Sequence, residues 1–262
     1  MSLVFSAITP NSPLLLEEVA EEESEQLIKT RLAIKELEQK LYLSKPETII
    51  IIYKHDGLCE DKFCFNIEPK LKSDFSDFGN ISISETWQCD NILASEIELT
   101  LTKLPFQLIS KEKLRKDISV PLHFLTFNME NIKILPIGVC ELAKKPHLEL
   151  GQQLKKVIAD QTRRVAIIAS GGLSHSLSNE SPAGFHKDGA VFDNQIKKFL
   201  EQGDRKSIKR MDEATIENAN EYLYNPLLVM LGVLSNQTLT YQEISYQQSF
   251  GIGHLVANLE LP

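Results

Sequence analysis

Long apolar runs and amphipathic charged segments follow one another along the chain. The run 48–53, TIIIIY, is apolar and β-branched, which is typical of a strand buried on both faces of a sheet. The segments 131–139 and 164–170 have the same character. Segments with apolar residues at helical spacing lie between such runs. The pattern predicts strands over 3–8, 48–53, 63–67, 81–88, 131–139, 164–170, 239–245 and 252–261, and helices over 14–43, 91–104, 149–161, 191–201 and 214–234.

This alternation of strands and helices predicts an α/β fold. Its centre is a mixed β-sheet with helices on both faces. A chain of 262 residues is long enough for one large domain with a full hydrophobic core. No repeat, low-complexity stretch or linker divides it, so we expect one domain over residues 1–262.

Composition and charge exclude several classes of function. The formal net charge is −8, which disfavours nucleic-acid binding and anionic membranes as partners. No apolar run approaches the length of a membrane span. The first sixteen residues lack a basic region and contain Pro10 and Pro13, which is unlike a signal peptide. We therefore predict a cytoplasmic protein whose four cysteines are reduced thiols.

Two histidines stand where predicted strands give way to loops. His55 follows the strand 48–53, and His175 follows the strand 164–170 within the segment GGLSH. Ligands bind α/β sheets at such strand ends. A histidine there can bind a metal or transfer a proton, and it can equally be a loop residue that bonds to backbone. The residues alone leave both readings open.

The order and wording of the loop segments resemble the class III extradiol ring-cleavage dioxygenases of the LigB type and the related Memo-like proteins. The resemblance runs over nearly the whole chain, which implies the same α/β fold. It rests on AITPNSPLLL, SKPETIIIIYKHDG, SVPL, ILPIGV, AIIASGGLSHSL, PAGF and SYQQSFGIGHLVANLEL, in that order.

The resemblance implies an Fe(II) ion held by two histidines and one carboxylate, with an aromatic diol as substrate. The position of the first histidine is Asn11 here, the second is kept as His55, and the carboxylate position is Gln247. The catalytic histidine is kept as His175. Another histidine of the family, expected at Arg115-Lys116-Asp117, is absent. We expect Asn11, His55, His175 and Gln247 to converge on one cavity.

These substitutions remove one imidazole and the only anionic ligand, so the sequence predicts no bound cofactor. One hypothesis is a non-catalytic protein that binds a small ligand or a partner, with a homodimer as one form of assembly. An alternative is an active dioxygenase with a rearranged metal site. A zinc site at His55, Cys59 and Cys64 is a third reading. The remaining histidines, at 123, 147, 186 and 254, are interpreted as surface or packing residues.

Overall fold

The computed structural model describes residues 2–20, 25–55, 57, 61–79 and 82–261, and its strands form one eleven-stranded mixed sheet. The strands are β1 (Leu3–Thr9), β2 (Thr48–Lys54), β3 (Phe63–Asn66), β4 (Lys70–Ser73), β5 (Thr86–Cys89), β6 (Phe106–Ile109), β7 (Lys113–Leu114), β8 (Lys133–Val139), β9 (Val165–Ser170), β10 (Thr240–Ser249) and β11 (Ile252–Glu260). Their order is β10-β11-β1-β9-β2-β8-β5-β4-β7. Strand β3 pairs with β8, and β6 pairs with β3.

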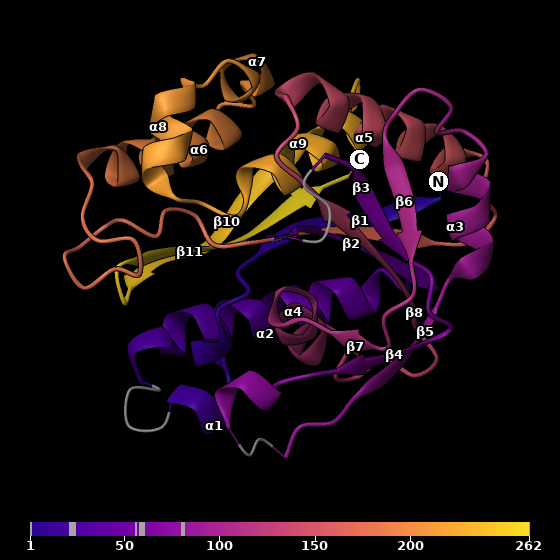
Figure 1. Ribbon diagram of the computed structural model, residues 1–262, viewed down its shortest axis with the longest axis horizontal. Coiled ribbons are helices and arrows are strands. Elements are labelled where there is room, and N and C mark those ends of the chain that lie inside the picture. The colour runs from indigo at the N-terminus through magenta and orange to yellow at the C-terminus, as the bar shows by residue number, and fades with distance from the viewer. Residues whose placement is uncertain (1, 21–24, 56, 58–60, 80–81, 262) are drawn as a thin grey trace.

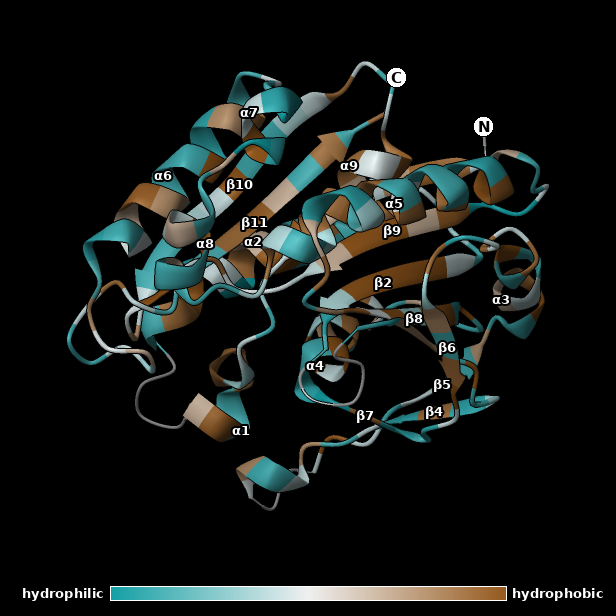
Figure 2. Ribbon diagram, turned by 45° about the horizontal axis from the view of Figure 1, so that its top comes forward, coloured by the Kyte–Doolittle hydropathy of each residue, from teal (hydrophilic) through white to brown (hydrophobic). Residues whose placement is uncertain are grey.

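The centre of the sheet consists of β1, β9, β2 and β8, which run parallel to one another. Every residue of β9 is buried, as is every residue of β2 except Lys54. Figure 2 shows these two strands as apolar bands inside the molecule. The prediction of an α/β fold around a mixed sheet is confirmed, since helices cover both faces of this strand core.

Helices α2 (Ile28–Leu43) and α4 (Lys116–Leu125) lie on one face, and α5 (Lys144–Ala159) and α9 (Tyr224–Val233) lie on the other (Figure 1). Helix α6 (Lys187–Glu201) packs against β10. The shorter helices are η1 (Pro13–Leu15), α1 (Glu17–Ala20), η3 (Ser76–Phe78), α3 (Asn91–Glu98), α7 (Arg205–Lys209) and α8 (Glu213–Ala219). Because β1, β9 and β2 are parallel neighbours, their carboxyl ends meet at one edge of the sheet.

The predicted helix over 214–234 is two helices. Asn220 adopts a left-handed conformation, with φ of 48°, and ends α8. Helix α9 begins four residues later at Tyr224, where its first backbone N–H groups need acceptors. The carboxylate of Glu221 accepts the N–H of Tyr224. The break brings the turn 220–223 to the edge of the sheet where β9 ends.

Helices α5 and α9 cross with two glycines at the contact. A Cβ atom on Gly151 would lie 2.0 Å from the carbonyl oxygen of Val229, and one on Gly232 would lie 2.5 Å from that of Leu148. Only glycine allows this approach, because any side chain would enter the facing backbone. The contact fixes α9, and with it the turn 220–223.

Two further findings bear on the sequence predictions. Cys64 is disulfide-bonded, so the prediction of four reduced thiols is wrong for this residue. Cys59 of the zinc hypothesis lies outside the described residues. Among the described residues, no helix is long and apolar enough to cross a membrane.

Candidate functional site

A pocket of about 300 Å³ opens at the carboxyl ends of β1 and β9, between η1, the first turn of α4 and the start of β11. It is the hollow that contains both Asn11 and His175. Its walls are lined by Asn11, Ser12, Pro13, Leu14, Lys116, Asp117, Gly172, His175, Pro182, Tyr222, Ile252 and His254.

Asn11 forms one wall and is held in a polar network. Its Nδ2 donates to Oδ1 of Asp117 at 3.0 Å, and both side chains are buried. The other carboxylate oxygen of Asp117 forms an ion pair with Arg115 at 3.1 Å. The backbone carbonyl of Asp117 accepts the hydroxyl of Ser170, at the end of β9, at 2.6 Å. Asn11 thus bonds to a carboxylate whose charge is already balanced.

His175 is presented by the loop after β9. Its Nδ1 lies 3.0 Å from the carbonyl oxygen of Leu173, so Nδ1 carries the proton and Nε2 carries the lone pair. Its ring packs edge-on against Tyr222, with 4.9 Å between centroids. Burial lowers the pKa of His175 to about 4, and the positive charges of Lys116 and Lys54 act in the same direction. The imidazole is therefore neutral near pH 7.

The loop that carries His175 is anchored by Asp193 of α6. Its Oδ1 accepts the backbone N–H of Ser174 at 2.8 Å, and its Oδ2 accepts the hydroxyl of Tyr246 at 2.7 Å. Burial raises the pKa of Asp193 to about 6, and these two hydrogen bonds oppose the rise. Gly253 leaves room for the carboxylate, because a Cβ atom there would lie 2.1 Å from Oδ2.

His55 lies at the same edge of the sheet but is not one of the residues that line the pocket. Its backbone N–H donates to the carbonyl of Val139 at 2.8 Å, and its ring is 5.7 Å from that of Tyr53. Tyr53 in turn interacts electrostatically with Arg115 and Asp117. His55 is buried against Gly138 of β8, where an added Cβ atom would lie 3.1 Å from its side chain.

Gln247, like His55, is not one of the residues that line the pocket with Asn11 and His175. Its Oε1 accepts from the hydroxyl of Thr30 at 2.8 Å and from its backbone N–H at 3.1 Å, and its Nε2 donates to the carbonyl of Gln26. Of the four residues expected on one cavity, Asn11 and His175 line this pocket, and His55 and Gln247 do not. Gln247 lies on β10, the edge strand beyond β11, and its side chain is hydrogen-bonded to residues at the start of α2 and just before it.

His254 stands directly opposite Gln247 in the antiparallel pairing of β10 with β11, one strand closer to β1. It is fully buried and lines the pocket. Of the two readings of His254, surface or packing residue, burial excludes the surface one. Tyr222 and Asp117 also line the pocket. A signal for His254 exists in the sequence: it is the one polar, ionisable residue within the apolar stretch 252–257.

The donor groups do not fit the Fe(II) centre that the family resemblance implies. The amides of Asn11 and Gln247 are hydrogen-bonded elsewhere, and Gln247 lies outside the pocket. Among the described residues, no group of three or more His, Cys, Asp or Glu side chains is arranged to hold a metal ion. Asp117, the carboxylate that lines the pocket, is bound to Arg115 and Asn11.

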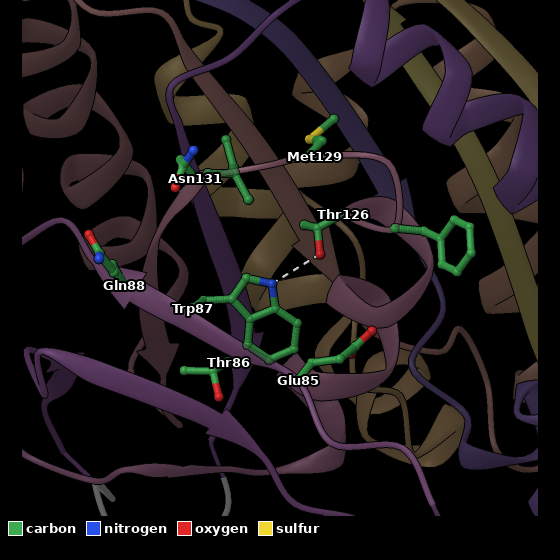
Figure 3. A pocket seen from close by; sticks show the side chains of 9 residues that line it. Glu85, Thr86, Trp87, Gln88, Thr126, Met129 and Asn131 are labelled. Atoms are coloured by element: carbon green, nitrogen blue, oxygen red, sulfur yellow. Dashed lines mark hydrogen bonds between the residues drawn. The ribbon is translucent and has the colours of Figure 1, made fainter.

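A second cavity, of about 530 Å³, lies beside β5 and contains none of the predicted site residues. Figure 3 shows the indole of Trp87 donating to the hydroxyl of Thr126, at 3.0 Å, with Glu85 and Met129 around it. Trp87 is nearly buried there, which makes it a useful fluorescent reporter of folding.

Comparison with known proteins agrees with this fold. A family model described as the catalytic LigB subunit of aromatic ring-opening dioxygenase matches residues 6–257. The chain therefore belongs to the LigB family.

The chain is similar to one bacterial protein in sequence and to another in structure. Protein CA_C1420 of Clostridium acetobutylicum is 26% identical over 271 residues, which cover 99% of this chain and 58% of that protein. The chain thus spans little more than half the length of this relative. The crystal structure of the uncharacterized protein JW3007 from Escherichia coli K12 superposes with a TM-score of 0.70 at 14% identity, covering 98% of this chain and 99% of that one. The second likeness shows a shared fold.

Proposed function

We propose that this chain is a LigB-family protein that binds a small molecule in the pocket at the ends of β1 and β9, without iron-dependent ring opening. The observation that carries the proposal is the hydrogen bond from Asn11 to Asp117. Asn11 occupies the position where the family resemblance implies a metal-binding histidine. A neutral amide in a charge-balanced network is suited to recognising a polar group, and it is a weak ligand for iron.

The pocket itself has the character of a small-molecule site. Its volume of about 300 Å³ is at the lower end for such sites and suits a ligand of single-ring size. Its lining combines apolar side chains, among them Leu14, Pro182 and Ile252, with a larger number of polar ones. By family resemblance an aromatic diol is the first ligand to test.

The test combines metal analysis with binding. Protein purified without chelators is analysed for iron, titrated anaerobically with Fe(II), and assayed for catechol-dependent oxygen uptake. Catechol binding is measured by calorimetry on the same preparation. We expect catechol binding with substoichiometric iron and no oxygen uptake. One iron per chain together with catechol-dependent oxygen uptake would establish the alternative, an active dioxygenase with a rearranged metal site.

Assembly and location complete the proposal. We propose a cytoplasmic protein, because the charge and patterning of the chain disfavour export and membrane contact. A homodimer is the proposed assembly, and light scattering coupled to size exclusion measures it directly. A monomer at micromolar concentration would remove that part of the proposal and leave ligand binding unaffected.

A further inference from the structure

His254 is a buried imidazole whose hydrogen-bonding capacity is not used. Its side chain is fully buried, and neither ring nitrogen is within hydrogen-bonding distance and angle of a partner among the described residues; the backbone of Ser249 is close enough to raise its pKa but does not meet that geometry. Buried polar groups in proteins are almost always paired, because an unpaired one lowers stability. An apolar residue at this position of β11 would avoid that loss. The arrangement therefore requires an explanation other than packing.

His147 shows how the same fold treats a histidine that serves packing alone. It is also fully buried. Its Nδ1 lies 3.0 Å from the carbonyl oxygen of Ala143, and its Nε2 lies 3.1 Å from that of Cys140. It makes no contact with the strand-end pocket. The contrast indicates that His254 is kept unpaired for the pocket that it lines.

Two neutral imidazoles face this one pocket. Burial lowers the pKa of His254 to about 4, the neighbouring His175 lowers it further, and the backbone of Ser249 opposes the shift. A neutral imidazole offers one N–H donor and one lone pair. His175 presents its Nε2 lone pair, because its Nδ1–H is engaged by Leu173. The pair can thus bracket one group that both donates and accepts.

We propose that His254 is a ligand-binding residue, and that His254 and His175 together hold a hydroxyl group of an uncharged ligand of single-ring size. The hydroxyl donates to Nε2 of His175 and accepts from the N–H of His254. This inference rests on the proposed function and adds to it the residue and the chemical group by which the ligand is recognised. Asn11 and Lys116 also line this pocket and remain for a second polar group.

The experiment compares two leucine variants, since leucine is close to histidine in volume and has no polar side-chain atom. Calorimetry measures catechol, 1,2-dimethoxybenzene and benzoate binding to wild type, His254→Leu, His254→Gln and the control His147→Leu. Differential scanning fluorimetry gives each Tm. We expect His254→Leu to keep or raise the Tm and to weaken catechol binding by roughly tenfold, as losing one buried hydrogen bond does. His254→Gln restores part of that binding.

The control should behave in the opposite way. His147→Leu loses the hydrogen bond that its one N–H makes to the carbonyl of Ala143 or Cys140, so its Tm falls while its Kd for catechol stays that of the wild type. Equal catechol affinity in His254→Leu and wild type would overturn the role of His254 and leave the proposed function standing. Failure of the wild type to bind catechol would overturn both. Benzoate or dimethoxybenzene binding as tightly as catechol would refute recognition of an uncharged hydroxyl.

Discussion

The carboxylate of Asp193 provides a test of how burial and hydrogen bonding compete beneath the His175 loop. Its pKa is about 6 in the folded protein, against 3.8 in an unfolded chain, chiefly because of burial. Each pKa unit corresponds to about 1.4 kcal/mol. Since the folded state holds this proton more tightly, the contribution of Asp193 to stability falls as pH rises from about 4 to about 6. Ionisation of Asp193 therefore costs about 3 kcal/mol at neutral pH.

Asp193→Asn removes this cost while keeping an acceptor for Ser174 and offering a donor to the oxygen of Tyr246. We expect its free energy of unfolding, relative to wild type, to rise by about 2 kcal/mol between pH 4.5 and 7.5. Urea titrations followed by the fluorescence of Trp87 measure this difference, in which the titration of all other groups cancels. A difference that is constant across this pH range would refute the reasoning. Tyr246→Phe should have the opposite sign, because it removes a donor from the charged carboxylate.

Three further outcomes are expected. Gly151→Ala should lower stability by about 1–3 kcal/mol or more, and weaken catechol binding as well, because the new methyl enters the backbone of α9; fluorimetry and calorimetry measure the two effects. Asn11→His combined with Gln247→Glu should gain no iron affinity in an anaerobic Fe(II) titration, since residue 247 faces Thr30; a clear gain would show that this side chain reorients. Folding lowers the pKa of His254 from 6.5 to about 4, so the contribution of His254 to the free energy of unfolding should be lost as pH falls from about 6.5 to 4, by about 3 kcal/mol. In urea titrations, the free energy of unfolding of His254→Leu should therefore fall correspondingly less on acidification.

The elements that could be predicted from the sequence are those whose pattern reflects burial alone. The run 48–53 indicates a central strand, because it is short, five of its six residues are β-branched, and its four isoleucines fit no exposed element. The break at Asn220 was missed because the apolar spacing continues across it. The break depends on the left-handed conformation of Asn220 and on the hydrogen bond from Tyr224 to the carboxylate of Glu221, and both are set by tertiary structure. Helix α4 was missed because Pro121 lies inside it.

The site was predictable where it coincides with strand ends and not elsewhere. Asn11 and His175 follow β1 and β9 directly, and the parallel arrangement brings such residues together. Gln247 and His254 lie within a hairpin, where the position of a side chain depends on pairing. Strand β10 shifts register between Glu243 and Ser245, and this shift is not visible in the residues. The family resemblance implies a site residue, Gln247, on the outer strand β10, whereas the pocket is lined by His254 of the inner strand β11.

The pairing of β1 with β11 has a consequence for how the protein is made. The hydroxyl of Ser6 donates to the carbonyl of Leu259, 253 residues along the chain, and the other neighbour of β1 is β9. During synthesis, β1 emerges from the ribosome long before either partner exists. Until then, the apolar residues of β1 are exposed to solvent or bound by a chaperone. The pocket that contains Asn11 and His175 is therefore incomplete until β11, which supplies Ile252 and His254, has emerged.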